Sequence, residues 1–128
     1  MSTVFEHQVG VRWRDVDGLG HVNHAVFLTC LEEGRDAFCV QALGRDPRYV
    51  VARVEIGMRA GVRYCGRQLR VRIEVERVGT ASLTARETIL TPAGVTAARA
   101  RVVTVLRDAG ARKPAAFAAQ ERARLAAY

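Results

Sequence analysis

The sequence predicts an α+β fold in which one antiparallel sheet of five strands curves around a single long helix. A long apolar segment, residues 24–43, has helical start and stop signals at its two ends. One segment before it and four segments after it alternate apolar and polar residues, as half-buried strands do. The economical arrangement of these elements is one sheet packed against one helix.

The helix is expected over residues 24–43. Asn23 is a good N-cap for it, and Gly44 is a natural stop. Apolar side chains cover much of its circumference, so we expect the helix to be buried on most sides. Glu32 and Arg35 lie three residues apart, a spacing at which their side chains can pair on the helix surface.

The strands are expected at residues 4–13, 50–59, 70–76, 82–90 and 95–107. In the first, one alternating face carries mostly Phe5, Val9, Val11 and Trp13. Each strand should have one face toward the core and one toward water, as is common in antiparallel sheets. Gly79-Thr80 and Pro92-Ala93-Gly94 supply the last two turns. An Ala-rich segment over residues 114–127 predicts a short C-terminal helix.

Length and segment composition predict a compact soluble protein. A chain of 128 residues can bury one substantial core, so we expect residues 1–128 to form a single domain. Its apolar runs fall short of the roughly 20 residues that span a bilayer. Residues 1–7 have neither the basic region nor the apolar segment of a secretory signal. We therefore expect a cytoplasmic protein without a membrane partner.

The three cysteines fit a reducing compartment. On the helix, Cys30 and Cys39 would lie about 13 Å apart by helical rise, too far for a disulfide. Neither these residues nor Cys65 have zinc-ligand spacing, and the carboxylates and histidines match neither zinc nor EF-hand patterns. We expect apolar packing residues and no metal site.

The net charge of +7 comes from 20 basic and 13 acidic residues, with Lys113 as the single lysine. Such an excess can mark a surface for nucleic acid or another anion. It can also arise where a chain uses arginine on solvated strand faces. The basic residues are dispersed, and helix-turn-helix, zinc-finger and aromatic RNA-binding patterns are missing from the sequence. We expect no nucleic-acid partner, whereas a ligand with a few phosphates would need only two or three arginines.

Residues 14–24 bring two carboxylates and two imidazoles through a glycine-containing loop to the start of the helix. Bare N–H groups at a helix start carry partial positive charge, which suits an oxyanion or a polarised carbonyl. Asp17 could act on that carbonyl as a base or a nucleophile. Asp15 and Asp17 could equally serve the turn itself, where aspartate often makes local hydrogen bonds.

A longer signature spans this loop and the following helix: Asp15-x-Asp17-x-x-Gly20-His21-Val22-Asn23-x-x-x-Phe27-Leu28, then Glu33 and Arg35. It resembles the signature of hot-dog-fold acyl-CoA thioesterases of the hydroxybenzoyl-CoA thioesterase-like group, over roughly residues 5–110. The resemblance implies a hot-dog fold, with a five-stranded antiparallel sheet wrapped around one long central helix. It also implies a cofactor-free enzyme that hydrolyses acyl-CoA thioesters. Many members have Asn in place of His24 and Tyr in place of Phe27. These two differences leave the loop carboxylate and the backbone N–H at the helix start in place.

The resemblance also assigns roles to residues. Asp17 would be the catalytic carboxylate, activating water or attacking the carbonyl directly, and the backbone N–H of His24 would polarise the thioester carbonyl. The expected substrate-binding residues are Gly20, His21, Asn23, Arg77, Thr80 and Ser82, the last three on the coenzyme A phosphates. Asp15 is expected to pair with Arg12 or Arg14. Glu33 is a second candidate carboxylate, because some hot-dog enzymes carry their acid on this helix.

Other assignments stay open at this stage. A non-catalytic acyl-CoA-binding protein would share the fold but lack the carboxylate. A hot-dog hydratase or dehydratase would use a different Asp/His arrangement. One helix cannot cover both faces and the edges of such a sheet, so we expect a homodimer or a dimer of dimers, with each active-site loop against its partner.

Overall fold

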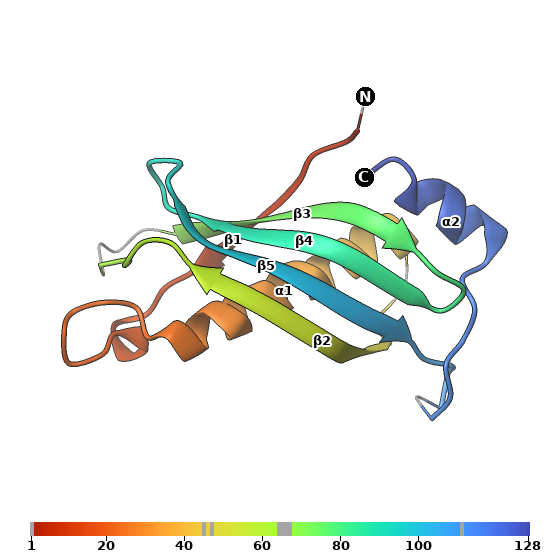
Figure 1. The fold of residues 1–128 in the computed structure, drawn as a ribbon, viewed down its shortest axis with the longest axis horizontal. Helices are drawn as coiled ribbons and strands as arrows, with labels where there is room; N and C mark the ends of the chain where they lie inside the picture. The colour runs from red at the N-terminus through yellow and green to blue at the C-terminus, as the bar shows by residue number, and fades with distance from the viewer. Residues whose placement is uncertain (1, 45, 47, 64–67, 111) are drawn as a thin grey trace.

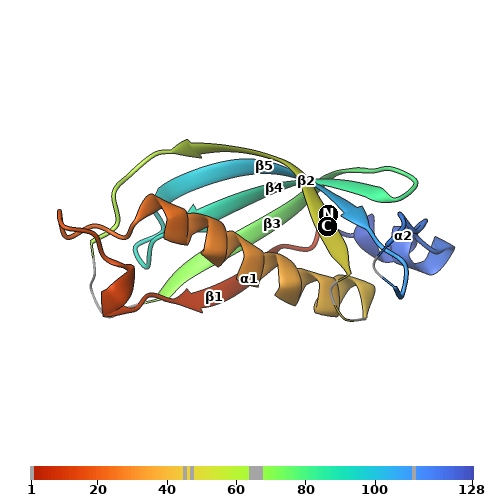
Figure 2. The same ribbon diagram turned by 90° about the horizontal axis from the view of Figure 1, so that it is seen from below.

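A computed structural model describes residues 2–44, 46, 48–63, 68–110 and 112–128. Its elements are, in chain order, β1 (Phe5–Gly10), the 3-10 turn η1 (Trp13–Asp15), α1 (His24–Leu43), β2 (Tyr49–Met58), β3 (Gln68–Val78), β4 (Ser82–Leu90), β5 (Thr96–Leu106) and α2 (Ala119–Leu125). The strands form a five-stranded antiparallel sheet that curves around α1, and α2 lies at one end of it (Figures 1 and 2). The predicted fold class is confirmed.

The strand order across the sheet is β1-β3-β4-β5-β2, so the strands that flank α1 in the chain form the two edges. β2 pairs with β5, with Met58 opposite Ala98. The chain therefore passes from one edge of the sheet to the other between β1 and β2, and α1 makes this crossing over one face (Figure 2). The crossing brings the start of α1 and the end of β2 to the same pocket.

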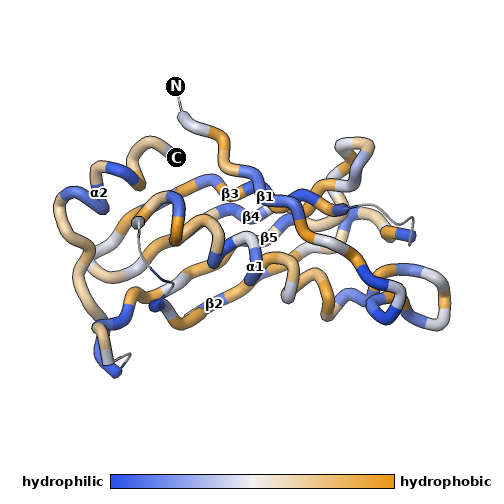
Figure 3. The backbone as a smooth tube through the Cα atoms, turned by 180° about the vertical axis from the view of Figure 1, so that it is seen from behind, coloured by the Kyte–Doolittle hydropathy of each residue, from blue (hydrophilic) through white to orange (hydrophobic). Residues whose placement is uncertain are grey.

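The core lies between α1 and the inner face of the sheet, whose strands alternate apolar and polar positions (Figure 3). Phe27, Leu31 and Phe38 lie on one side of the helix and are at most 3% exposed. Gly34 faces Val71 on β3, where an added Cβ would lie 2.5 Å from the Val71 Cγ1 atom. The helix can approach the sheet this closely because Gly34 has no side chain.

Helix α1 begins and ends at the predicted residues, and Gly44 ends it with φ +68°. Its burial differs from the prediction, because Leu28 is 45% exposed and Val40 is 55% exposed. The expectation of burial on most sides is therefore wrong. The sheet covers one side of the helix, and the opposite side faces solvent at these two residues.

The expected Glu32–Arg35 pair on the helix surface is also wrong. Arg35 is buried, and its guanidinium forms an ion pair with Glu87 on β4. Arg35 lies four residues after Leu31 and three before Phe38, so its side chain leaves the helix on the side that faces the sheet. Glu32 stays on the exposed side.

The first strand ends at Gly10, earlier than predicted. The Arg12 N–H donates to Asp15 Oδ2 (2.8 Å), and the Asp15 N–H donates to the Arg12 carbonyl oxygen (2.9 Å). These bonds close a turn in place of continued strand pairing. As a result Trp13, expected on the buried face, is 75% exposed.

The C-terminal helix is shorter than the predicted range 114–127. The Phe117 N–H donates to the Thr80 carbonyl oxygen (2.9 Å), which holds the segment before α2 in an extended conformation beside the β3–β4 turn. Glu121 Oε1 accepts a hydrogen bond from the Ala118 N–H (2.9 Å) and caps the helix start. Tertiary hydrogen bonding therefore overrides the helix propensity of the alanines before residue 119.

The expectation of one buried face is wrong for β2. Its side chains include exposed apolar ones on both faces, at Val50, Val51, Val54 and Met58. Among the described residues, β2 is an edge strand that pairs with β5 on one side only. Its other edge presents unpaired backbone groups beside this apolar surface.

In the described part of the chain, no helix is long and apolar enough to cross a membrane. Cys30 and Cys39 are buried thiols, as expected of packing residues. Cys65 lies outside the described residues.

Candidate active site

The loop before α1 is a short hairpin closed by backbone hydrogen bonds. The Asp17 N–H donates to the His21 carbonyl oxygen (2.8 Å), and the Gly20 N–H donates to the Asp17 carbonyl oxygen (3.0 Å). Gly20 has φ +81°, a left-handed conformation that glycine adopts without strain. The Val22 N–H then donates to the Val62 carbonyl oxygen (2.6 Å) and fixes the loop to the segment after β2. Gly20 is therefore needed by the backbone of the turn.

The Asp17 carboxylate is held by one of its two oxygens. Asp17 Oδ1 accepts hydrogen bonds from the Leu19 N–H (2.9 Å) and the His21 N–H (3.3 Å). Oδ2 makes no hydrogen bond to the residues that the structure describes, and the side chain is exposed. This arrangement fixes the direction of the carboxylate and leaves one oxygen available to a ligand or a water molecule.

The start of α1 offers a free backbone donor. Asn23 Oδ1 accepts a hydrogen bond from the Ala25 N–H (2.9 Å), so the predicted N-cap is confirmed. His24 is the first helical residue, and within the described ranges its N–H has no acceptor. A helix N-terminus that leaves its first N–H unpaired can polarise a carbonyl oxygen that accepts a hydrogen bond from it.

Asp17 and His24 line one pocket, which we call the loop pocket. Its volume is about 320 Å³, and it opens to solvent. It is lined by residues of the loop, the first turn of α1 and the end of β2: Asp17, Val22, His24, Phe27, Met58, Arg59, Ala60 and Gly61. A carboxylate and a helix N-terminus therefore meet in one pocket, as the sequence signature predicts, and Arg59 adds a positive charge at its wall.

His21 lies against the segment that follows β2. It forms an isolated antiparallel bridge with Arg63, and a Cβ added at Gly61 would lie 3.2 Å from the His21 Cδ2 atom. The side chain of Arg63 lies near Gly20, because a Cβ added at Gly20 would be 3.8 Å from the Arg63 Nη1 atom. These contacts give His21 a part in ordering the loop.

The three residues expected on the coenzyme A phosphates lie at the other end of the sheet. Arg77 is near the end of β3, Thr80 lies in the turn that follows, and Ser82 is the first residue of β4. This turn is next to α2, whereas the loop before α1 and the end of β2 lie at the opposite end of the sheet (Figure 1). These two segments line the loop pocket. Within one copy of the chain, the structure does not bring these residues together with Asp17.

Asp15 has the structural role expected of it. It is 7% exposed, and its carboxylate forms an ion pair with Arg12 (Oδ1 to Nη2, 3.3 Å). The hydrogen bond from the Arg12 backbone N–H and the nearby guanidinium lower the pKa of Asp15 from its ordinary value, against the effect of burial. The Asp15 carbonyl oxygen also accepts the Asn23 N–H (2.8 Å), which ties η1 to the start of the helix.

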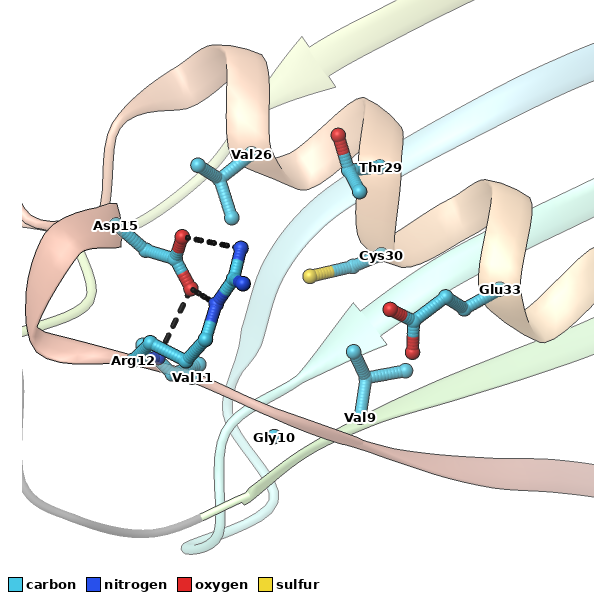
Figure 4. Close-up of a pocket in the computed structure, with 9 residues that line it drawn as sticks. All are labelled: Val9, Gly10, Val11, Arg12, Asp15, Val26, Thr29, Cys30 and Glu33. Carbon is cyan, nitrogen blue, oxygen red and sulfur yellow. Dashed lines mark hydrogen bonds and ion pairs between the residues drawn. The ribbon is translucent and has the colours of Figure 1, made fainter.

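Glu33 lines a second pocket, of about 390 Å³, between β1 and α1 (Figure 4). The Asp15–Arg12 ion pair and the Cys30 thiol also line it, whereas Asp17 does not. Burial and the negative charges of Glu33 and Asp15 raise the pKa of Cys30 to about 11, so this thiol stays protonated at neutral pH. The structure therefore keeps Glu33 apart from the loop pocket.

Four lining residues of the loop pocket were not expected from the sequence: Met58, Arg59, Ala60 and Gly61. They reach the pocket because β2 pairs at the far edge of the sheet, and no local pattern predicts that pairing. Phe27 is part of the sequence signature, but its place in the pocket wall was not expected. Over the described ranges, no group of three or more His, Cys, Asp or Glu side chains could hold a metal ion.

The fold corresponds to that of a class of known proteins. The thioesterase-like superfamily matches residues 11–125, and the chain belongs to this family. It is a hot-dog-fold thioester hydrolase. A search of curated proteins found no match.

Solved structures agree with this assignment. The chain is similar to a thioesterase from Thermus thermophilus complexed with coenzyme A and Zn, with 31% identity, a TM-score of 0.80 and coverage of 94% of this chain and 95% of that one. A predicted thioesterase from Bacillus stearothermophilus is 26% identical, with a TM-score of 0.84 and coverage of 97% and 95%. A 1,4-dihydroxy-2-naphthoyl-CoA thioesterase from Synechocystis shares the fold at 18% identity, with a TM-score of 0.79 and coverage of 97% and 96%.

Proposed function

We propose that the protein, with residues 1–128 as one hot-dog domain, is an acyl-CoA thioesterase that uses Asp17 and the backbone N–H of His24. The observation that carries this proposal is that both residues line the loop pocket. The thioester carbonyl oxygen accepts the His24 N–H, which no other described group uses, and negative charge on that oxygen is stabilised as the carbonyl carbon is attacked. The Thermus relative with bound coenzyme A supports the choice of substrate.

Asp17 acts on the carbonyl carbon by one of two routes. In the first, Oδ2 takes a proton from water, the hydroxide adds to the carbonyl carbon, and the carbon–sulfur bond breaks to release coenzyme A as a thiolate. In the second, Oδ2 attacks the carbon directly, the thiolate leaves, and water cleaves the resulting anhydride. Both routes end in a free acid and coenzyme A and need no cofactor. Oδ1 keeps its bonds to Leu19 and His21, which hold the carboxylate in place.

The coenzyme A phosphates and the oligomeric state belong to the same proposal. The β2 edge is free and apolar, and two copies related by a two-fold axis would pair their β2 edges antiparallel. Tyr49, the first residue of β2, lies opposite Leu106, and the Leu106 N–H donates to the carbonyl oxygen of Ala81 in the β3–β4 turn. The start of β2 therefore lies at the end of the sheet that carries this turn. In such a homodimer, or a dimer of dimers, Arg77, Thr80 and Ser82 of a second copy would approach the loop pocket and meet the phosphates. Gly20, His21 and Asn23 would shape the near side of the site.

The placement of the charges and cysteines supports the remaining expectations. On the outer face of the sheet, Glu6 pairs with Arg70 and Arg72, and Glu76 pairs with Arg86 and Arg101. The two carboxylates offset half of the charge of these four arginines, which reduces the positive surface that a nucleic acid would need. The buried thiols of Cys30 and Cys39 fit a reducing cytoplasm.

The test is hydrolysis of a panel of aliphatic and aromatic acyl-CoAs, measured as the release of free coenzyme A thiol. We expect turnover of at least one member of the panel without added metal or cofactor. Binding of coenzyme A without release of thiol from any member would favour the non-catalytic alternative and contradict the proposal.

A further inference from the structure

One phenylalanine, Phe27, lines the loop pocket. Phe27 is 3% exposed and is the most buried of the residues that line the pocket; Val22 is 5% exposed and Met58 is 46% exposed. Phe27 belongs to the first turn of α1, three residues after His24. A group that enters past Asp17 and the helix start therefore reaches Phe27.

The core behind Phe27 is filled. On the inner face of the sheet beside the pocket, Met58 of β2 lies opposite Ala98 of β5, and Ala98 lies opposite Ile89 of β4. Ala98 is 1% exposed and Ile89 is fully buried, as is Leu31 on the next turn of the helix. Interiors packed in this way have few voids larger than a water molecule.

The helix and the sheet are also in close contact further along α1. At Gly34 the helix lies so near Val71 that an added Cβ would come within 2.5 Å of the valine side chain. Beyond it, Phe38 makes edge-to-face contacts with Phe5 and Tyr128, with ring centroids 5.2 and 5.1 Å apart. The space between α1 and the sheet is thus occupied at Gly34 and Phe38, and the second pocket, between β1 and α1, shares no lining residue with the loop pocket.

We propose that Phe27 determines the acyl specificity of the enzyme by setting the depth of the loop pocket, and that the preferred substrates carry short or compact acyl groups. This inference rests on the proposed hydrolysis of acyl-CoA in the loop pocket. The pocket volume of about 320 Å³ lies at the low end of the roughly 300–1,000 Å³ typical of small-molecule sites. A long alkyl chain would have to displace the Phe27 ring or remain in solvent.

The experiment compares butyryl-CoA, octanoyl-CoA and dodecanoyl-CoA as substrates of the wild type, Phe27→Ala and Phe27→Leu. The leucine variant serves if truncation to alanine prevents folding. For the wild type we expect kcat/KM to fall from butyryl-CoA to dodecanoyl-CoA. In Phe27→Ala the dodecanoyl-to-butyryl ratio of kcat/KM should rise at least about tenfold, because fitting even one further methylene in a pocket is worth that much.

The matched controls are Phe38→Ala and Phe38→Leu. Phe38 is the same residue type on the same side of α1, it is 1% exposed, and it lies outside the lining of the loop pocket. These variants lose the same atoms from the core, and their chain-length ratio should stay within about threefold of the wild type. A role of Phe27 in stability alone would move the ratio no more than these controls do.

A second readout does not depend on turnover. S-butyl-CoA and S-dodecyl-CoA are thioethers that cannot be hydrolysed, and calorimetry gives their Kd for each variant. We expect the Phe27 variants, but not the Phe38 variants, to gain affinity for the dodecyl compound relative to the butyl compound. If no thiol is released but the Phe27 variants still show this shift in Kd, the result contradicts the proposed hydrolysis and supports the role of Phe27 in the pocket. Unchanged ratios in the folded Phe27 variants, or equal shifts at Phe38, would overturn the inference.

Discussion

Arg35 on α1 donates two hydrogen bonds to Glu87 on β4, with its Nε and Nη2 atoms each 3.0 Å from one carboxylate oxygen. The two side chains are 52 residues apart in the chain, and at most 8% of either is exposed. Burial raises the pKa of Glu87, and the carboxylate in turn raises the pKa of Arg35. This bidentate pair joins the long helix to the middle of the sheet.

Breaking this pair from one side should destabilise the protein strongly. In Glu87→Gln, Arg35 remains buried without its counter-charge, and we expect the free energy of unfolding to fall by about 3–5 kcal/mol. Removing both charges, in Arg35→Met with Glu87→Leu, should cost much less. Urea denaturation of the three proteins checks both expectations.

The control for this prediction is an exposed pair, Arg53 and Glu55 on β2. Glu55→Gln should change the free energy of unfolding by less than about 1 kcal/mol, because water and salt screen exposed charges. Equal losses in Glu87→Gln and Glu55→Gln would show that burial does not set the strength of the Arg35–Glu87 pair.

Replacing the loop carboxylate should remove turnover without unfolding the protein. Asp17→Asn keeps an acceptor oxygen for the Leu19 and His21 N–H groups but cannot take up a proton or attack, so kcat should fall at least about 100-fold. Asp15→Asn should lower stability while reducing kcat much less. Steady-state kinetics together with circular dichroism separate these effects, and near-normal kcat in folded Asp17→Asn would refute its role.

The role of His24 can be divided between its backbone and its side chain. His24→Pro removes the first N–H of α1, at a position where proline is well tolerated, and Asn23 has the extended ψ of 134° that a following proline requires. We expect a loss of about 3 kcal/mol in transition-state stabilisation, as for other oxyanion donors. His24→Ala keeps the N–H and should stay within about tenfold of the wild type in kcat/KM. Equal losses in the two variants would assign the effect to the imidazole.

The free β2 edge predicts self-association. A charge at Val51 on this edge strand, introduced as Val51→Lys, should weaken pairing between two copies, because edge lysines oppose strand addition. Val95→Lys adds the same charge at an exposed apolar residue outside β2 and is the matched control. Light scattering should show a dimer or tetramer for the wild type and for Val95→Lys, and smaller species for Val51→Lys. A wild-type protein that is a fully active monomer would exclude a shared site.

The Asp15–Arg12 pair should stabilise the fold in a pH-dependent way. The pKa of Asp15 is lower in the folded protein than its ordinary value of 3.8, so the unfolded chain takes up a proton first as the pH falls. The stabilisation is therefore fully present above that ordinary value and is lost as the pH falls through the lowered pKa. The difference in unfolding free energy between wild type and Asp15→Asn should be larger at about pH 7 than at about pH 2. A difference that does not shrink in acid would contradict this assignment.

The sequence by itself determined the features that depend on near neighbours in the chain. The bounds of α1 follow from the Asn23 side chain and from Gly44, which act on backbone groups a few residues away. The catalytic candidates are predictable for the same reason, because Asp17, Gly20 and His24 lie in one short loop. The antiparallel strands were predicted from the alternation of apolar and polar residues. Two segments depart from their local propensity: η1, where the Asp15 side chain binds the Arg12 N–H, and the segment before α2, where the Thr80 carbonyl oxygen binds the Phe117 N–H.

Only the tertiary structure decided which distant groups meet. Local periodicity is the same whether a strand lies at the centre or the edge of a sheet, so it could not place β2 beside β5 or bring Met58 to the loop pocket. Nor could it choose Glu87 over Glu32 as the partner of Arg35, since both carboxylates are chemically able to pair and only helix-to-sheet packing selects between them. The same packing places Phe27 among the residues that line the loop pocket, because the elements that meet around a pocket are set by the tertiary fold.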